Sequence, residues 1–177
     1  MFRAYIPHFL TFLFQGVAPF RGFVQERVSL AKRAIEKNGD DALADWGPMY
    51  LFYGCRSSKE DYLYKDEWPE YQAVLGDNFK MFVAVSREGP RKPDGGKIYV
   101  QDLLAKEKEG IADALLNGKG YVYVCGDAKN MSKSVEAQLV RILGEGKAGA
   151  EGSVEAEGLK ELNFLKEKSR YLTDVWS

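Results

Sequence analysis

The sequence predicts an α/β domain in which a parallel sheet of about five strands carries helices on both faces. Two observations favour this class. Short apolar runs, typical of buried strands, alternate with longer amphipathic segments, typical of helices. Motifs rich in glycine, cysteine and charged residues recur where the apolar runs end, and a parallel sheet gathers such ends at one edge. A chain of 177 residues, 45% of them hydrophobic, fits one domain with a substantial core.

Composition excludes several classes of function. Lys and Arg total 25 against 26 Asp and Glu, so the net charge of −1 gives no basic footprint for nucleic acid. An anionic ligand must therefore be held by a local cluster of cations. Cys55 and Cys125 are too few for a disulfide framework and suit a reducing compartment. The single histidine, His8, stands apart from other ligand types, so we expect no metal site.

The apolar run at residues 9–14 is the first strand candidate. It is far too short to span a bilayer. A signal-peptide core is the alternative, but the run lacks a convincing small-residue cleavage site. We therefore interpret residues 9–14 as a buried strand.

Turn and cap signals bound the other elements. Pro19 suits the first turn of a helix, which Asn38 and Gly39 should end. Ser58 and Asp61 resemble a capping pair that opens a helix, which Pro69 should interrupt or bend. The Gly-, Ala-, Glu- and Ser-rich residues 144–158 are predicted to form a mobile insertion. The expected strands are 9–14, 49–53, 80–85, 120–125 and 171–175, and the expected helices are 19–36, 58 onward, 99–116, 128–143 and 159–168.

Two of the junction motifs carry recognisable chemistry. Gly16 before Pro19 allows a sharp strand-to-helix turn whose free N–H groups can face a phosphate. Ser86, Arg87 and Lys97 supply charged donors suited to a phosphate dianion, because Arg offers a bidentate fork that Lys lacks. A solvated basic loop is the alternative for this second group.

The motifs together resemble a known family. They are Gly16–Phe23, Tyr53–Arg56, Ser86-Arg87 with Lys97–Gln101, Tyr123–Met131 and the ending Asp174-Val175-Trp176-Ser177. In this order and spacing they resemble the NADP(H)-binding domain of the diflavin reductases, over residues 16–177. The resemblance implies a ferredoxin–NADP reductase-like fold. The Val-Trp-Ser ending favours the branch that reduces haem proteins such as cytochrome P-450. The equivalent domain of another diflavin reductase is the alternative.

The resemblance also implies roles for individual residues. Ser86, Arg87 and Lys97 would hold the 2′-phosphate of NADP, with Tyr99 beside the adenosine and Gln101 nearby. Cys125 and Asp174 would flank the hydride path, and Trp176 would stack on the flavin ring until nicotinamide displaces it. From the residues alone, a buried cysteine is more often a small hydrophobe, which we assign to Cys55. The expected catalytic residues are Cys125, Asp174 and Trp176, and the expected cofactor-binding residues are Gly16, Arg56, Ser86, Arg87, Lys97, Tyr99, Gln101, Asp127, Asn130 and Trp176.

One region departs from the family. Its Gly-Pro-Gly-Thr-Gly phosphate turn is replaced by Phe12-Leu13-Phe14-Gln15-Gly16, in which only the last glycine remains. We therefore divide the chain into an atypical segment, 1–15, and an NADP(H)-binding oxidoreductase domain, 16–177.

The function implied by the resemblance is that of an NADPH-binding module in an NADPH–haemoprotein reductase. Hydride would pass to FAD, and electrons would pass to FMN and on to a haem protein. No FAD- or FMN-binding region is recognisable in the chain, so we expect it to be inactive alone and to need both flavin-binding domains as partners. A non-catalytic nucleotide-binding or interaction domain is the rival interpretation. The full-length family is expected at the cytosolic face of the endoplasmic reticulum membrane, and this chain alone in the cytoplasm as a soluble protein.

Overall fold

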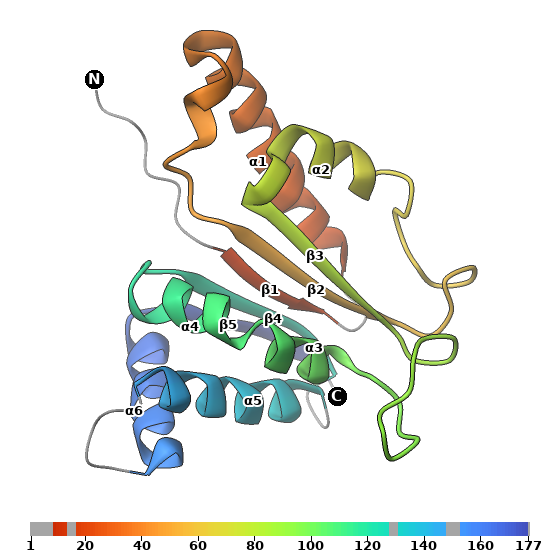
Figure 1. Ribbon diagram of the computed structural model, residues 1–177, viewed down its shortest axis with the longest axis vertical. Coiled ribbons are helices and arrows are strands. Elements are labelled where there is room, and N and C mark those ends of the chain that lie inside the picture. Colours follow the sequence, from red (N-terminus) through yellow and green to blue (C-terminus); the bar gives the residue numbers. More distant parts are fainter. Residues whose placement is uncertain (1–8, 14–16, 128–130, 148–152, 177) are drawn as a thin grey trace.

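The computed structural model describes residues 9–13, 17–127, 131–147 and 153–176 (Figure 1). Strands and helices alternate along most of the chain, which confirms the α/β class. In order, the elements are β1 (Phe9–Leu13), α1 (Val17–Asn38), the 3-10 turn η1 (Asp40–Leu43), β2 (Met49–Cys55), α2 (Trp68–Leu75), the 3-10 turn η2 (Gly76–Asn78), β3 (Phe79–Val85), α3 (Val100–Lys106), α4 (Lys108–Leu116), β4 (Tyr121–Asp127), α5 (Met131–Gly146), α6 (Val154–Glu167) and β5 (Tyr171–Trp176).

The described strands form one sheet in the order β3-β2-β1-β4-β5, and every neighbouring pair is parallel. The apolar run that begins at Phe9 is the central strand, β1, between β2 and β4. Because the chain leaves β1 toward β2 and β3 on one side and returns to β4 on the other, the strand order reverses at β1. Ligands of open α/β sheets bind at such a reversal, outside the carboxyl ends of the strands.

Helices cover both faces of the sheet (Figure 1). Helices α1 and α2 lie on one face, and α3 to α6 lie on the other. All seven residues of β2 are buried, with Tyr50 and Phe52 in the α3–α6 core and Leu51 and Tyr53 in the α1–α2 core. A strand that alternates between two cores in this way reads as a continuous apolar run. In the part of the chain that the structure describes, no helix is long and apolar enough to cross a membrane.

The expected helix at Ser58 is wrong, because the residues before Trp68 form turns. The Asp61 carboxylate, taken as part of a cap, instead accepts the backbone N–H groups of Arg56 and Ser57 and so folds the chain into a loop. Pro69 lies in the first turn of α2, where it opens the helix and does not bend it.

The Gly-rich stretch after residue 143 also differs from expectation at both ends. Helix α5 continues to Gly146, and α6 begins at Val154, where the Ser153 side chain accepts the Ala156 N–H at 3.1 Å. A Cβ atom on Gly144 would collide with the Val154 carbonyl, and one on Gly158 with the Val140 carbonyl. These two glycines therefore allow α5 and α6 to pack closely, and the prediction of an insertion is wrong for them. Residues 148–152 lie outside the described part.

Candidate functional site

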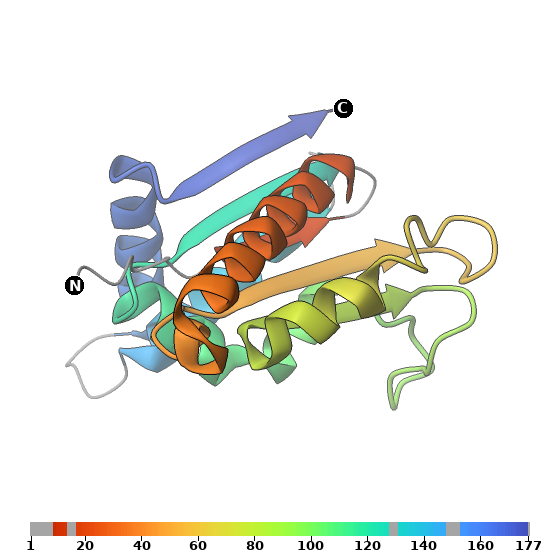
Figure 2. The same ribbon diagram turned by 90° about the horizontal axis from the view of Figure 1, so that it is seen from above.

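The carboxyl ends of the described strands meet at one edge of the sheet (Figure 2). Cys55, at the end of β2, pairs in register with Val85, at the end of β3. On the other side of β1, Cys125 of β4 pairs with Asp174 of β5. The two groups of expected site residues thus lie on opposite sides of the central strand, at the edge where ligands of such sheets bind.

Cys125 and Asp174 form the β4–β5 side of the site. Cys125 is only 3% exposed, whereas Asp174 is exposed. Burial raises the pKa of the Cys125 thiol, and the negative charge of Asp174 raises it further. The thiol is therefore neutral at pH 7 and poorly suited to act as a nucleophile. A neutral thiol beside a carboxylate can instead orient a polar ring and stabilise positive charge that develops on it.

A hollow of about 210 Å³ adjoins this pair on the α1 face of the sheet. Phe23 of α1 contacts Tyr123 of β4 with ring centroids 5.3 Å apart, and Phe20 meets Phe23 edge-on at 5.7 Å. These three aromatics lie within motifs noted in the sequence, but sequence reasoning gave them no role in the site, although the i, i+3 spacing of the two phenylalanines was a signal. The lining residues are Pro19, Phe20, Phe23, Tyr123, Val124, Cys125, Leu172, Thr173 and Asp174.

Arg56 and Arg87 lie together on the β2–β3 side. The pairing of the strands continues past their ends, since Ser86 N–H donates to the Cys55 carbonyl at 2.9 Å and Arg87 N–H to the Arg56 carbonyl at 3.0 Å. Both arginine side chains are exposed. The positive charges of both arginines help to lower the pKa of Asp61, so all three side chains lie within electrostatic range of one another.

Two carboxylates support this pair of loops, and sequence reasoning assigned neither to the site. Asp61 accepts Arg56 N–H at 3.0 and 2.9 Å and Ser57 N–H at 2.6 Å. Burial raises the pKa of Asp61, but the hydrogen bonds from Ser57 and Arg56 and the two arginine charges outweigh it, and the pKa is lowered. Glu88 accepts the Ser58 N–H at 3.0 Å and its hydroxyl at 2.6 Å. Hydrogen bonds from Ser57 and then Ser58 lower the pKa of Glu88 to about 2.

The remaining clamp residues follow β3 in the connection to α3. Lys97 is exposed and pairs with Arg91 in an isolated antiparallel bridge, so the loop folds back on itself. Tyr99, 36% exposed, precedes α3, and its N–H donates to Asp102 at 2.8 Å. Gln101 lies in the first turn of α3. The single helix expected over 99–116 is wrong, because α3 and α4 are separate helices that meet at Glu107.

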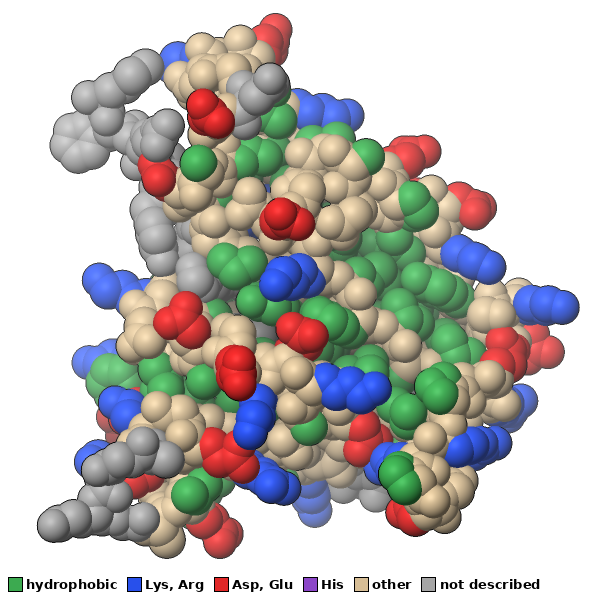
Figure 3. Space-filling model, viewed as in Figure 1, with side chains coloured by type: hydrophobic (Ala, Val, Ile, Leu, Met, Phe, Trp, Pro, Cys, Tyr) green, Lys and Arg blue, Asp and Glu red, His purple; other side chains and the backbone are tan. Residues whose placement is uncertain are grey.

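Charge around these loops is mixed. Figure 3 shows Lys and Arg side chains beside Asp and Glu side chains over the face it presents. Lys92 illustrates this, since its ammonium group pairs with Asp102 at 2.8 Å. Attraction for an anion must therefore come from the local placement of Arg56 and Arg87.

Of the remaining expected site residues, the structure describes two by their backbone and leaves two outside the described part of the chain. Gly16 and Asn130 lie outside the described residues. Asp127 and Trp176 end β4 and β5 and pair in register with each other, which brings their backbones together beyond Cys125 and Asp174.

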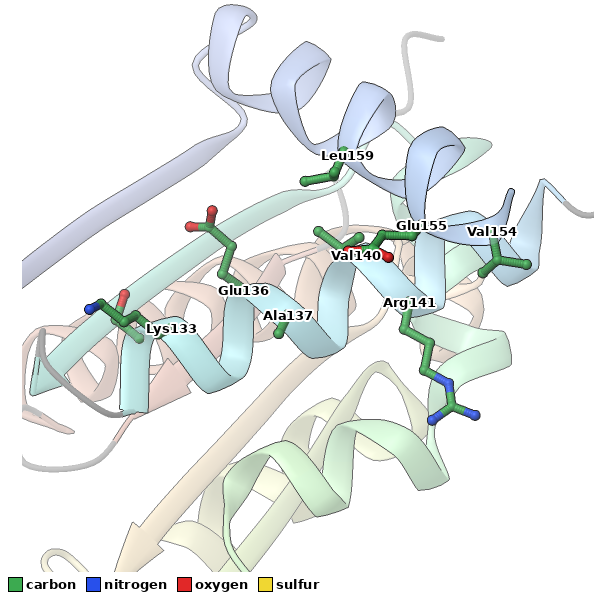
Figure 4. A pocket seen from close by; sticks show the side chains of 9 residues that line it. Lys133, Glu136, Ala137, Val140, Arg141, Val154, Glu155 and Leu159 are labelled. Atoms are coloured by element: carbon green, nitrogen blue, oxygen red, sulfur yellow. The ribbon is translucent and has the colours of Figure 1, made fainter. Parts of the chain in front are cut away.

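A larger hollow of about 580 Å³ lies between α5 and α6 (Figure 4). Its lining combines the apolar side chains of Ala137, Val140, Val154 and Leu159 with the charged side chains of Lys133, Glu136, Arg141 and Glu155. None of the described residues expected in the site lines it.

Comparison with known proteins identifies the family. The profile of the oxidoreductase NAD-binding domain matches residues 15–137, more than two thirds of the chain. The chain belongs to the oxidoreductase NAD-binding domain family. The match covers the described strands β2 to β4, including Cys125 of β4, and the loops that carry Arg56 and Arg87.

Relatives of this NAD-binding domain are NADPH–cytochrome P450 reductases. The protein of that name from Phanerodontia chrysosporium is 66% identical over 162 residues, which are 92% of this chain and 22% of the relative. The one from Aspergillus niger is 46% identical and that from Saccharomyces cerevisiae 43% identical over the same number of residues, in each case 21% of the relative. The chain thus spans about a fifth of the length of the relatives it matches.

Proposed function

We propose that this chain is the NADP(H)-binding module of an NADPH–cytochrome P450 reductase-type flavoprotein, with a ferredoxin–NADP reductase-like fold. The proposal rests on one observation. The edge of the sheet at which the carboxyl ends of the strands meet has two chemically different halves. One half offers Arg56 and Arg87, and the other offers a buried neutral thiol, Cys125, beside the carboxylate of Asp174.

The spacing of the two halves suits an extended dinucleotide. From β3 to β4 there are three strand-to-strand steps, which is about 14 Å at the usual spacing between strands. A dinucleotide whose adenosine lies over β2 and β3 can therefore extend its nicotinamide toward Cys125 and Asp174. The intervening strand end is that of β1, where the dinucleotide pyrophosphate would cross.

The basic half would select NADP(H) over NAD(H). The backbone N–H groups of Ser86 and Arg87 already bind the carbonyls of β2 and its extension, so an incoming phosphate must be held by side chains. Ser86, Arg87 and Lys97 would hold the 2′-phosphate, with Arg56 as a further cation. Tyr99 would lie against the adenosine and Gln101 beside it.

The thiol half would receive the nicotinamide. Asp174 would stabilise the positive charge that remains on the ring, and Cys125 would orient the ring beside the aromatic hollow. Bound NADPH supplies the hydride, and an FAD-binding domain elsewhere in the protein supplies its acceptor. Trp176 would cover the flavin ring between turnovers. Asp127 and Asn130 would complete this half of the site.

The wider assignments rest on the same resemblance. We infer that FAD- and FMN-binding domains are the partners of this module, that a haem protein such as cytochrome P450 receives the electrons, and that the whole protein acts at the endoplasmic reticulum membrane. We also infer that residues 1–15 form an atypical segment that replaces the family's first strand and phosphate turn, of which Gly16 alone remains. The NADP(H)-binding oxidoreductase domain would then be residues 16–177, with Phe9–Leu13 supplying its central strand, β1.

Calorimetric titration with 2′-AMP and 5′-AMP tests the proposal, because the two ligands differ only in where the phosphate is attached. Tighter binding of 2′-AMP supports the clamp, and equal affinities would refute it. Flavin reduction by NADPH, after this chain is exchanged for the matching region of the Phanerodontia chrysosporium reductase, tests the hydride step.

A further inference from the structure

Three consecutive backbone N–H groups beside the basic half are already bound to carboxylates. Those of Arg56 and Ser57 donate to Asp61, and that of Ser58 donates to Glu88. Successive N–H groups that point to one side form a natural anion site. In this protein the anions are side chains of the protein itself, so the amides fix the loop and are not open to a ligand phosphate.

Glu88 joins two loops that are far apart in sequence. It follows Arg87 directly, and its partner Ser58 lies 30 residues earlier, two positions after Arg56. Ser57, which is buried, lies close enough for its side chain to help lower the pKa of the Glu88 carboxylate. The loops that carry Arg56 and Arg87 are therefore linked by backbone pairing at Arg87 and by two hydrogen bonds from Ser58 to the Glu88 carboxylate.

The carboxylate that links the loops acts against the electrostatic attraction of the site for an anion. Glu88 places a negative charge next to Arg87, where it lowers the attraction of the site for a phosphate dianion. A carboxylate in that position favours phosphate binding only if holding the two arginines in place raises the affinity more than the repulsion between the carboxylate and the phosphate lowers it. Fixing side chains and loops before binding removes an entropic cost from the binding step.

We propose that Glu88 is a positioning residue for the 2′-phosphate clamp: by accepting the N–H and hydroxyl of Ser58 it holds Arg56 and Arg87 at a fixed separation, and so sets the selectivity for 2′-phosphorylated nucleotides. Asp61 assists by fixing the other end of the same loop. The inference rests on the proposed function, since it assigns Glu88 to that clamp.

The direction in which Glu88→Ala changes the affinity for 2′-AMP distinguishes a positioning role of Glu88 from an effect of its charge. If Glu88 acts only through its charge, Glu88→Ala tightens 2′-AMP binding. If Glu88 positions the arginines, the same change weakens 2′-AMP binding about three- to tenfold and leaves 5′-AMP binding nearly unchanged. Glu60→Ala is the matched control, because it removes one exposed acid from the same loop and should leave 2′-AMP affinity unchanged or slightly higher.

Calorimetry of the full chain and its variants measures these affinities, and Glu88→Gln tests for rescue because its amide oxygen can still accept the Ser58 N–H. Amide hydrogen exchange supplies a readout without ligand: exchange at Ser58 should accelerate in Glu88→Ala and recover partly in Glu88→Gln. If 2′-AMP binding tightens or is unchanged in Glu88→Ala while the parent prefers 2′-AMP, the positioning role is wrong and the clamp stands. If the parent shows no preference, the clamp itself is wrong, and the role of Glu88 in it is rejected with it.

Discussion

Cys125 and Asp174 face each other across the β4–β5 pairing, one buried and the other exposed. Burial, and then the negative charge of the neighbouring carboxylate, raise the pKa of the Cys125 thiol and so keep it protonated. It is the reverse of a nucleophilic cysteine site, in which nearby positive charge stabilises the thiolate. The geometry is therefore consistent with a cysteine that contacts a ligand and does no covalent chemistry.

The two cysteines should be unreactive in the folded protein. Burial raises the pKa of both thiols, that of Cys55 to about 11, so the thiolate is a minor form of each at pH 7.5. We expect iodoacetamide to label both far more slowly in the native chain than in urea. Mass spectrometry after timed labelling measures this, and native labelling of Cys125 at the rate of a free thiol would contradict the described site.

The helix-packing glycines give a stability prediction. Gly158→Ala should lower the free energy of unfolding by about 1–3 kcal/mol, because the new methyl group meets the Val140 carbonyl at the α5–α6 contact. Gly22→Ala is the control, since a Cβ there has no atom within 4 Å, and it should raise stability by about 0.5–1 kcal/mol through helix propensity. Urea denaturation followed by circular dichroism compares them. Equal effects of the two changes would mean that α5 and α6 do not pack as described.

Acid should weaken the loop link within a defined range of pH. The pKa of Glu88 in the folded protein is about 2, below its value of about 4.3 in an unfolded chain. A depressed pKa contributes stability that is fully present above the unfolded value and is lost as the pH falls through the folded value. Glu88→Gln should therefore flatten the dependence of stability on pH between about 4.3 and 2. Denaturation midpoints at several pH values measure the slope, and a parallel shift at all of them would show that Glu88 does not titrate in this way.

Some of the fold could be predicted from sequence, and the reason is physical. Strands β2 and β4 are largely apolar runs, because β2 is buried on both faces and β4 is buried on one face and mostly half-buried on the other, and that signal is local. The parallel α/β pattern then places their ends at one edge, which is how Arg87 and Cys125 could be assigned to one site. Gly39 ended α1 as predicted, with a φ of 79° that glycine adopts readily.

The features that sequence reasoning missed depend on contacts between distant segments. Glu88 is informative only once Ser58 is known to lie beside it, 30 residues away. Gly144 and Gly158 looked like a linker because composition cannot distinguish a flexible glycine from one that admits a neighbouring backbone. The Asp61 carboxylate followed Ser58 at the spacing of a helix cap, but its partners were the amides that precede Ser58.

Trp176 gives a prediction for the flavin-containing protein. After this chain replaces the matching region of the Phanerodontia chrysosporium reductase, Trp176→Ala should slow NADP⁺ release and raise activity with NADH, because the indole no longer competes with nicotinamide for the flavin. Stopped-flow flavin reduction with NADPH and NADH measures both effects. If Trp176→Ala discriminated between NADPH and NADH as the parent does, Trp176 would not compete with nicotinamide for the flavin as proposed.

The central claim is that side chains at the end of β3 recognise the 2′-phosphate. Calorimetric titration of the chain with NADP⁺ and NAD⁺, repeated for Arg87→Ala, tests it most directly. One or two charged hydrogen bonds to the phosphate, each contributing about 1.5–3 kcal/mol, predict that the parent binds NADP⁺ at least about tenfold more tightly than NAD⁺. Arg87→Ala should remove most of that difference by weakening NADP⁺ binding alone. Equal affinities in the parent, or an unchanged ratio in Arg87→Ala, would contradict the account.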